Sequence, residues 1–573
     1  MSMTLNDIID ASQKKFSDLP AVGMALETPI TYQVFYERII ALAGRLSREG
    51  VKKGDHIAIL AENSPNWGAA YFAIVRLGAV VVPVLPDLPE ADVHHILTEM
   101  RVPLLFTTER QIEKIYELNQ RGLKRIITLD DSVASLDLLA VETFSGYLAG
   151  AMEMWKKAEA KGGLVFDKVC EDDLASILYT SGTSGYSKAV MLSHKNLAAN
   201  ARSASAMIHI EPGAAFLSIL PLSHAYEFTV GFILPLLRGA RIAYAGKTPT
   251  PAILQKLCSQ EKPFAMFVVP LVLEKIYKKR VITQISKSFT LSLLCKVGWG
   301  RKFIHKRIGA KLLEFFGGNL QLMGIGGAAL NPDVEQFLYD ADFPYLIGYG
   351  LTECAPLLAG GPPGDKTIVV GSSGKPVPGV RIKIVAPDSR TGIGEIYGYG
   401  PNVMRGYYND PDATAETITA DGWLATGDLG FIDDLGNLHI RGRSKNVIVM
   451  SNGENVYPEA IEHKMNAYPW VVESLVVENN GRLDGWVYPD YEYIDAATTG
   501  QSRFQCHEYI AGLLTEMRKE LNEQLSSAAR LTRILERREP FVKTATHKIK
   551  RYLYSGGSMM SLARGLFCCA KGD

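Results

Sequence analysis

The stretch Ala175-Ser-Ile-Leu-Tyr-Thr-Ser-Gly-Thr-Ser-Gly-Tyr-Ser-Lys188 joins a short apolar run to a loop of hydroxyl, glycine and lysine residues. The apolar run predicts a strand over 175–178. In the loop, glycines let backbone amides approach phosphate oxygens, hydroxyls donate hydrogen bonds, and Lys188 supplies a positive charge. Its spacing does not fit the G-x-x-x-x-G-K-[ST] phosphate loop. We predict a phosphate cradle of another type, although the loop alone also fits a flexible surface connection.

Two further loops carry related chemistry. Ile347-Gly-Tyr-Gly-Leu-Thr-Glu353 sets an aromatic ring, a hydroxyl and a carboxylate after a predicted strand. The ring can stack on a base, and the carboxylate of Glu353 is a hard oxygen ligand for Mg²⁺. Trp423-Leu-Ala-Thr-Gly-Asp428 places a carboxylate in a tight turn, where it can accept hydrogen bonds from a ribose diol or form an ordinary Asx-turn. Each loop taken alone leaves both interpretations open.

The pattern along the chain predicts an α/β fold with two domains. Short β-branched runs alternate with amphipathic stretches between residues 56 and 269, which is typical of parallel sheets buried on both faces. From Gly371 to about His439, short segments with turn signals predict a β-rich subdomain. The polar join Arg441-Gly-Arg-Ser-Lys445 predicts a boundary. We therefore expect an N-terminal domain over 1–444, a C-terminal domain over 445–555 and a tail over 556–573.

Composition excludes several function classes. Lysine plus arginine and aspartate plus glutamate number 61 each, so no overall positive field favours nucleic acid as a partner. The seven cysteines are scattered without a C-x-x-C pair or zinc spacing, which predicts a reducing, cytoplasmic location. The first residues lack a secretory apolar core, and arginine and proline interrupt the most apolar runs. We predict no membrane span.

Further motifs complete a family pattern. Gly326-Gly-Ala328, Gly442-Arg-Ser-Lys445 and Lys543-Thr-Ala-Thr-His-Lys-Ile-Lys-Arg551 accompany the three loops. Together they closely resemble the successive core motifs of the adenylate-forming superfamily, which comprises acyl-CoA synthetases, luciferases and carrier-loading adenylation domains. The resemblance runs from about Tyr32 to Arg551. It implies parallel-sheet α/β subdomains, a β-rich subdomain and a small mobile α+β C-terminal domain, in an enzyme that uses ATP and Mg²⁺.

The resemblance also implies a role for each matching residue. The loop over the β- and γ-phosphates would consist of Thr180, Ser181, Gly182, Thr183, Ser184, Gly185 and Lys188. Around the rest of the nucleotide, Gly327 and Ala328 would flank the adenine, Tyr349 would stack on it, Thr352 would contact the α-phosphate, Glu353 would hold Mg²⁺, and Asp428 with Arg443 would bind the ribose. Lys548 would bridge the substrate carboxylate and the α-phosphate. Lys445 matches the hinge about which the small domain would swing.

Such an enzyme needs concentrated positive charge. A carboxylate must attack an anionic α-phosphate while pyrophosphate leaves, so lysines and Mg²⁺ offset the repulsion and tight loops position the reacting groups. The resulting acyl-adenylate is open to attack by the thiol of CoA or of carrier-protein pantetheine.

Four positions depart from the family pattern. Ser187 replaces a proline and Ala189 a glycine in the phosphate loop, while Val542 and His547 replace a proline and a glycine near Lys548. None removes a charged or catalytic group. We expect them to affect the rate rather than the type of reaction.

Other segments point to a lipid-like acid. Pro221-Leu-Ser-His-Ala-Tyr-Glu-Phe228 and Phe315-Phe-Gly-Gly-Asn-Leu320 resemble the long-chain fatty acid branch, in which His224 and its neighbours line the acyl pocket. The segment from Lys275 to Lys311 holds eleven lysines and arginines, several aromatic and aliphatic residues and no acid. It predicts either a peripheral contact with an anionic membrane surface or a solvated helix face.

Three hypotheses follow. The leading one is an AMP-forming acyl-CoA synthetase that activates a carboxylic acid, in particular a long-chain fatty acid, and transfers it to CoA. A second is a ligase that loads a carrier protein. A third is a non-catalytic nucleotide-binding protein of this fold, which the retention of Lys188, Glu353, Asp428 and Lys548 disfavours.

Overall fold

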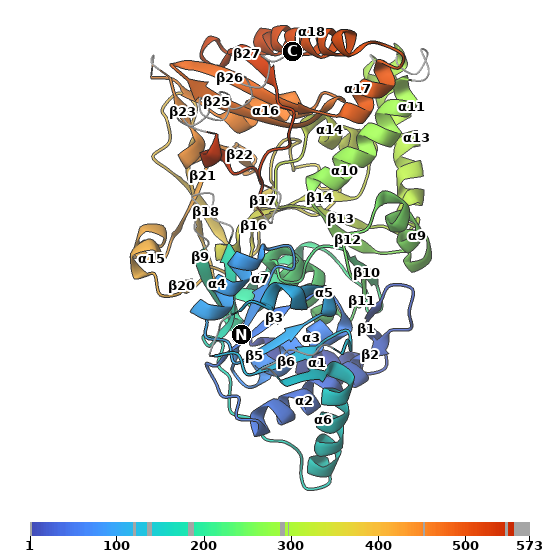
Figure 1. Cartoon of the computed structure of the whole chain (residues 1–573), viewed down its shortest axis with the longest axis vertical. Helices are drawn as coiled ribbons and strands as arrows, with labels where there is room; N and C mark the ends of the chain where they lie inside the picture. The colour runs from blue at the N-terminus through green and yellow to red at the C-terminus, as the bar shows by residue number, and fades with distance from the viewer. Residues whose placement is uncertain are drawn as a thin grey trace, which may run out of the picture.

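Two large sheets form the N-terminal part of the molecule. The structure is a computed structural model that describes residues 3–118, 122–133, 140–180, 188–286, 293–295, 297–450, 453–544 and 548–554. Figure 1 shows the first sheet in the lower half, the second sheet reaching from there to the middle beside the β-rich elements, and the C-terminal elements, in orange and red, at the upper end. The α/β expectation from the alternating sequence pattern is confirmed.

The first sheet carries the phosphate loop. Its strand order is β20-β9-β8-β4-β3-β5-β6-β7. The strands from β8 to β7 are parallel, whereas β9 runs antiparallel to β8 and β20 antiparallel to β9. Their bounds are β3 (His56–Leu60), β4 (Val80–Val84), β5 (Leu104–Thr107), β6 (Arg125–Thr128), β7 (Ala140–Thr143), β8 (Leu174–Thr180), β9 (Lys188–Ser193) and β20 (Gly406–Tyr407).

The second sheet begins with the N-terminal strands. Its order is β14-β13-β12-β10-β11-β1-β2, and all neighbours are parallel except β1 and β2. Strand β1 pairs with β11 in the register Val22 to Ile242, so the start of the chain completes a sheet built mainly from residues 215–347. The bounds are β1 (Pro20–Met24), β2 (Ile30–Thr31), β10 (Ala215–Ser218), β11 (Arg241–Tyr244), β12 (Ala265–Val268), β13 (Leu322–Ile325) and β14 (Tyr345–Ile347).

A buried helix packs in the core of this half. In α3 (Pro65–Arg76), all residues from Trp67 to Val75 are buried, because the helix has apolar residues on every side. Trp67 stacks on Tyr71 with ring centroids 5.5 Å apart, and Phe232 of the π-helical turn η2 (Glu227–Ile233) meets Trp67 edge-on. The N-terminal helix α1 (Leu5–Phe16) is amphipathic and buries Leu5, Ile8, Ile9 and Phe16 in the same core.

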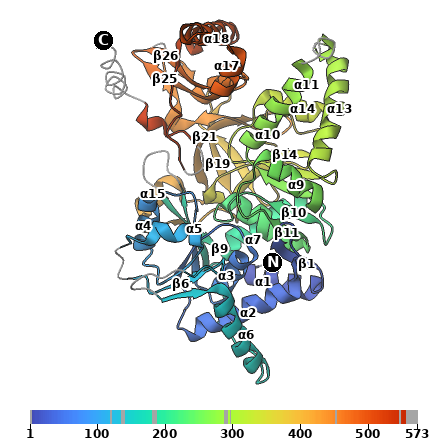
Figure 2. The same cartoon turned by 45° about the vertical axis from the view of Figure 1, so that its right-hand side comes forward.

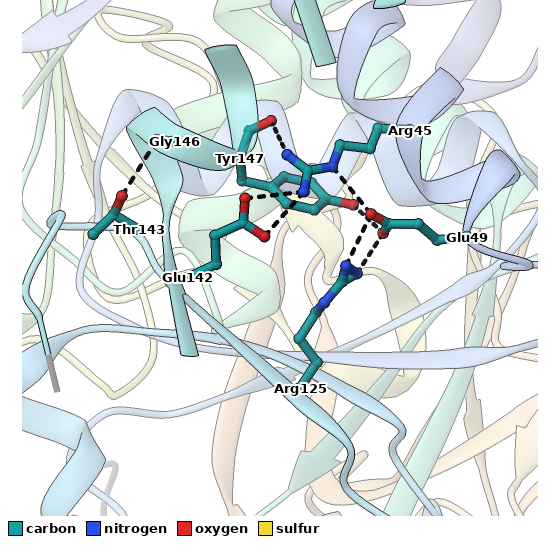
Figure 3. Close-up of polar contacts among 7 residues, drawn as sticks. All are labelled: Arg45, Glu49, Arg125, Glu142, Thr143, Gly146 and Tyr147. Atoms are coloured by element: carbon teal, nitrogen blue, oxygen red, sulfur yellow. Dashed lines mark hydrogen bonds and ion pairs between the residues drawn. The ribbon is translucent and has the colours of Figure 1, made fainter. Parts of the chain in front are cut away.

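A charged network fastens two helices to the edge of the first sheet. Arg45 of α2 (Tyr32–Arg48) donates to Glu49, to both carboxylate oxygens of Glu142 and to the backbone oxygen of Tyr147 in α6 (Phe144–Glu159). Its guanidinium lies 3.8 Å from the centroid of the Tyr147 ring, and Arg125 of β6 also contacts Glu49 (Figure 3). Because these groups share partners and are mostly shielded from water, they stabilise the fold more than isolated surface ion pairs do.

The predicted β-rich subdomain follows. The antiparallel sheet β18-β19-β21-β22 and the small sheet β15-β16-β17 lie next to the two large sheets. Their bounds are β15 (Tyr349–Gly350), β16 (Leu357–Gly360), β17 (Lys375–Pro376), β18 (Arg381–Val385), β19 (Gly394–Tyr399), β21 (Leu424–Ile432) and β22 (Leu438–Arg443).

The C-terminal elements have cores of their own. The largest groups Val456, Met465 and Trp470 with buried residues of β25, β26, β27 and α18. The elements are β23 (Ile448–Val449), β24 (Asn455–Val456), α16 (Pro458–Asn466), β25 (Val471–Asn479), β26 (Arg482–Pro489), α17 (Tyr491–Ala497), α18 (Arg503–Gln524), β27 (Leu531–Glu536) and the 3-10 turn η7 (Arg551–Leu553).

The remaining helices and π-helical turns complete the N-terminal part. They are α4 (Glu90–Glu99), α5 (Glu109–Ile112), α7 (His194–Met207), α8 (Leu234–Arg238), α9 (Pro251–Glu261), α10 (Pro270–Ile276), the π-helical turn η3 (Tyr277–Ile282), α11 (Thr283–Ser286), α13 (Gly298–Phe315), α14 (Pro332–Asp340) and α15 (Pro411–Thr417). Within the described ranges, no helix is both long enough and apolar enough to cross a membrane.

Candidate functional site

The predicted phosphate loop joins the ends of a β-hairpin. Strand β8 ends at Thr180, β9 begins at Lys188, and the two residues face each other in the antiparallel register. The hydroxyl of Thr180 donates to the backbone oxygen of Lys188 at 3.3 Å. The other predicted loop residues lie outside the described residues: Ser181, Gly182, Thr183, Ser184 and Gly185. The structure therefore establishes the two anchors of the loop.

Lys188 lies close to the predicted magnesium ligand. Its ammonium is 4.4 Å from the ring centroid of Tyr407 in β20. The Tyr407 hydroxyl in turn donates to Oε1 of Glu353 at 2.9 Å. Burial, and then the Glu353 charge, raise the pKa of the Tyr407 phenol, so this hydroxyl stays protonated and remains a donor. One tyrosine thus links a phosphate-loop cation to the carboxylate across the site.

Thr352 and Glu353 lie on the short 3-10 turn η4 (Thr352–Cys354), between β15 and β16. Both side chains are partly exposed. Among the described residues, no three histidine, cysteine, aspartate or glutamate side chains gather to form a metal cage. Mg²⁺ in nucleotide sites is typically bound by one or two carboxylates together with substrate phosphates and water. Glu353 fits that arrangement, because its Oε1 accepts from Tyr407 and no hydrogen bond from the described residues engages its Oε2.

The predicted ribose ligands meet across a hairpin. Asp428 of β21 pairs in register with Arg443 of β22, and Oδ1 of Asp428 lies 3.0 Å from Nε of Arg443. Oδ2 accepts the Tyr349 hydroxyl at 2.8 Å. Burial and the charge of Asp428 raise the pKa of this phenol, which keeps the donor protonated. One hydrogen bond and one ion pair thus join the three side chains and orient the carboxylate of Asp428.

Gly327 and Ala328 follow β13 at the carboxyl end of the second sheet. Both are exposed, and Gly327 has a φ of +86°, a backbone conformation that favours glycine. A flat ring can approach such a backbone closely. Their predicted contact with adenine, like the predicted stacking by Tyr349, stays a prediction.

His224 precedes the π-helical turn η2. Its Nδ1 accepts the backbone N–H of Tyr226 at 3.2 Å, so the neutral ring carries its proton on Nε2. Burial and the nearby ammonium of Lys548 lower the pKa of His224 to about 4. The imidazole is therefore uncharged at neutral pH.

Lys548, from the C-terminal part of the chain, lies close to the residues described above. The side chain retains exposure to solvent, yet surrounding protein removes part of its hydration and lowers the pKa of its ammonium. Arg443 lowers this pKa further, whereas Asp428 and Glu353 oppose the shift. Three charged groups, Arg443, Asp428 and Glu353, and the neutral imidazole of His224 thus lie close enough to Lys548 to interact with it electrostatically. Lys445, the predicted hinge, is exposed on the turn η5 (Ser444–Asn446), and none of its described contacts reaches this group.

Comparison with known proteins decides the family. A family model described as AMP-binding enzyme matches residues 9–408. The chain belongs to the AMP-binding enzyme family. A long-chain-fatty-acid–CoA ligase of Drosophila melanogaster, named heimdall, is 31% identical, and the match covers 80% of this chain and 72% of that protein. A long-chain-fatty-acid–CoA ligase of Yersinia pestis is 27% identical over 95% of both chains.

Solved structures of the same architecture agree with this membership. The anthranilate CoA ligase AuaEII, in complex with anthranoyl-AMP, superposes with a TM-score of 0.78 at 20% identity over 98% of both chains. ATP-bound MatB from Rhodopseudomonas palustris superposes with a TM-score of 0.73 at 24% identity, covering 96% of this chain and 98% of that one. The predicted family, the fold class, the enzymatic nature of the chain and its use of ATP are confirmed.

In this AMP-binding enzyme, two site residues escaped the sequence analysis. Tyr407 carries no motif signal, since its place beside Glu353 comes from the pairing of β20 with β9. Thr426 lies inside a quoted motif without an assigned role. Its hydroxyl donates to the backbone oxygen of Ile396 at 2.7 Å and accepts the backbone N–H of Asp428 at 3.1 Å. Two bonds thus hold the turn that presents Asp428.

Proposed function

We propose that this protein activates a long-chain fatty acid with ATP and transfers the acyl group to the thiol of CoA. The observation that carries the proposal is the convergence of Lys548, Arg443, Asp428, Glu353 and His224 on one site. Membership of the AMP-binding enzyme family supplies the adenylation chemistry. Relatives from insect and bacteria that carry the name long-chain-fatty-acid–CoA ligase support the choice of acid and acceptor.

The first half-reaction joins an acid to AMP. A carboxylate oxygen attacks the α-phosphorus, a new P–O bond forms, and the bond to pyrophosphate breaks. We assign Lys548 to the attacking carboxylate and the α-phosphate, and Thr352 to the α-phosphate. The loop from Thr180 to Lys188 holds the departing β- and γ-phosphates. These groups offset the negative charge of the phosphates and position the reacting atoms. Charge stabilisation and positioning are the main contributions of proteins to phosphoryl-type transfer.

The nucleotide is held by its ribose and base. Asp428, oriented by Tyr349 and Arg443, offers carboxylate oxygens to the ribose diol, and Gly327 with Ala328 flanks the adenine. Mg²⁺, when bound at Glu353, neutralises phosphate charge. In the second half-reaction the thiol of CoA attacks the acyl carbon of the adenylate, and AMP leaves.

We assign the acyl pocket to the region of His224. The neutral imidazole suits an uncharged acyl chain. The backbone N–H of Tyr226 donates to this imidazole, and the ring of Tyr226 lies 5.8 Å from that of Phe267. In this arrangement, the residues that select the acid, around His224, differ from those that bind the phosphates of ATP, in the loop from Thr180 to Lys188.

We further propose two domains, 1–444 and 445–555, followed by a tail over 556–573, with Lys445 as the hinge between them. Separate apolar cores before and after the turn Ser444–Asn446 support this division. For location, we propose a reducing, cytoplasmic compartment. The cysteines of the described residues, Cys170, Cys258, Cys295, Cys354 and Cys506, are free thiols, which supports it.

Pyrophosphate exchange over saturated acids of graded length tests the proposed substrate. Labelled pyrophosphate should enter ATP fastest with long-chain acids, and at least tenfold more slowly with acetate, because an apolar chain gains about 0.8 kcal/mol for each buried methylene. Thioester formation should then be measured with CoA and, side by side, with a holo acyl carrier protein. Product with the carrier protein alone would identify the alternative acceptor and contradict the assignment of CoA.

We also propose that the end of α13 touches an anionic membrane surface, where a lipid-like acid would be found. Trp299 and Phe303, one helical turn apart, are 72% and 64% exposed, and Lys302 is exposed between them. Figure 2 shows α13 at the outer edge of the molecule. Several charges of the segment are used elsewhere, since Arg301 pairs with Asp340 and Lys306 with Asp342. The predicted residues Lys287, Phe289, Leu291 and Lys296 lie outside the described residues.

Vesicle binding tests this surface. The double variant Trp299→Ala, Phe303→Ala should bind vesicles of phosphatidylcholine and phosphatidylserine at least tenfold more weakly than wild type, because burial of each aromatic side chain contributes roughly 1.5 to 3 kcal/mol. Cosedimentation at two salt concentrations measures this. Phe504→Ala is the matched control, since Phe504 is a 70% exposed aromatic residue on another helix. Equal binding by the double variant and wild type would rule out this surface.

A further inference from the structure

A lysine of the N-terminal part reaches into the C-terminal part. Lys278 lies on η3, the π-helical turn that continues α10. Its ammonium donates to three backbone oxygens, those of Asn466 at 3.0 Å, Tyr468 at 3.3 Å and Val471 at 3.1 Å. These oxygens belong to the end of α16 and the start of β25. In the sequence, Lys278 belongs to the basic segment from Lys275 to Lys311, whereas in the structure its ammonium lies between the two parts of the chain.

The geometry of this contact is well suited to an ammonium. A lysine has three N–H donors, and each of the three finds a carbonyl oxygen. The last carbonyls of a helix lack partners within it and carry the negative end of its dipole. Burial lowers the pKa of Lys278, while Glu274 and Asp490 favour its charged form. An apolar side chain at this position would leave the three oxygens without this partner.

Helix α16 also connects to the segment that carries Lys548. Arg551, three residues after Lys548, contacts Glu462 of α16 and lies 3.8 Å from Oε1 of Glu459 on the same helix. Thr544 and Lys548 are joined by a backbone hydrogen bond of 2.8 Å. A displacement of α16 would therefore be transmitted to Lys548.

The other end of the contact lies next to the nucleotide loop. Glu274, one helical turn before Lys278, accepts the backbone N–H of Asn331 at 3.2 Å. Asn331 caps α14, directly after the loop that contains Gly327 and Ala328. The helix α10, which leads into Lys278, thus contacts the loop of Gly327 and Ala328 through Glu274 and Asn331. The ammonium of Lys278 binds the end of α16, which contacts the segment of Lys548.

We propose that Lys278 is a positioning residue for acid activation, which docks α16 so that Lys548 lies in the site. The inference rests on the role of Lys548 under the proposed function. It predicts a selective defect, because a supplied acyl-adenylate no longer needs Lys548 to bring the acid and ATP together. Loss of the contact should slow the formation of the adenylate and spare its consumption.

The test compares the two half-reactions in the full-length Lys278→Met variant. Pyrophosphate exchange with a long-chain acid should fall by tenfold or more, whereas thioester formation from a supplied acyl-adenylate and CoA should stay within twofold of wild type. Lys278→Arg should recover only part of the exchange, since a planar guanidinium does not match three converging oxygens. Lys279→Met is the matched control, because Lys279 is the exposed next residue of the same turn.

The outcomes separate this inference from the proposed function. Wild-type protein without exchange for any acid would overturn the proposed function itself. Active wild type together with exchange within twofold in Lys278→Met would overturn the positioning role. An equal loss in both half-reactions, accompanied by a lower thermal midpoint, would also overturn it and assign Lys278 to stability alone.

Discussion

Replacing Lys548 with alanine should reduce acyl-adenylate formation by about 100- to 1,000-fold and leave the turnover of a supplied acyl-adenylate nearly unchanged. Losing one charge-stabilising contact in a preorganised site costs about 3 to 4 kcal/mol of barrier. The setting of Lys548 supports such a cost. Its ammonium interacts with Arg443, Asp428, Glu353 and His224. The folded protein therefore already holds this charge among other polar groups, so little reorganisation is needed when the substrates bind.

Two assays on one preparation measure this prediction. Pyrophosphate exchange reports the first half-reaction, and thioester formation from synthetic acyl-adenylate and CoA reports the second. Lys550→Ala is the control, because Lys550 lies two residues further along the same segment and has no assigned role in the site. Exchange at the wild-type rate in Lys548→Ala would refute the role assigned to this lysine.

Replacing Asp428 with alanine should lower kcat/KM for ATP by about 100-fold. A hydrogen bond to a charged group contributes roughly 1.5 to 3 kcal/mol, and the variant loses the carboxylate that would accept from the ribose. It also loses the partner of the Tyr349 hydroxyl and of the Arg443 guanidinium, which lie 2.8 and 3.0 Å from its two oxygens. The expected effect is therefore on binding and orientation of the nucleotide, with little change in KM for the acid.

Deoxynucleotides distinguish a ribose contact from general damage. Wild type should prefer ATP to 2′,3′-dideoxy-ATP, and Asp428→Ala should lose most of that preference, because the partner of the missing hydroxyls is gone. Asp434→Ala, at an exposed position of the same hairpin, should behave like wild type. If Asp428→Ala kept the full preference for ATP, another residue would have to recognise the ribose.

The parallel sheets could be predicted because their signal is local. The runs at 57–60 and 80–84 are apolar at successive positions, as strands buried on both faces require, and they form most of β3 and all of β4. Most candidate site residues could be named for a related reason. Lys188, Glu353, Asp428 and Lys548 sit in short motifs whose residue types match the charge pattern of one reaction.

Residues that act through long-range pairing could not be predicted. Only the family resemblance implied that Asp428 and Arg443 act together, because their approach depends on the register of β21 and β22, which shifts between Leu429 and Gly430. Tyr407 reaches Glu353 because β20 adds to the edge of a sheet made much earlier in the chain. The same reason applies to Lys278, since a run of basic residues does not reveal which of them faces a domain distant in sequence.

The pairing of β1 with β11 has a consequence for how the protein is made. Val22 leaves the ribosome about 220 residues before its partner Ile242. At a synthesis rate of roughly 5 to 20 residues per second, β1 is made about 10 to 40 s before its partner strand β11. The apolar face of α1 lacks part of its core for the same time. During that interval Leu5, Ile8 and Ile9 have only part of their final packing. Nascent chains stalled before Arg241 should therefore be the stage at which this protein depends most on chaperones.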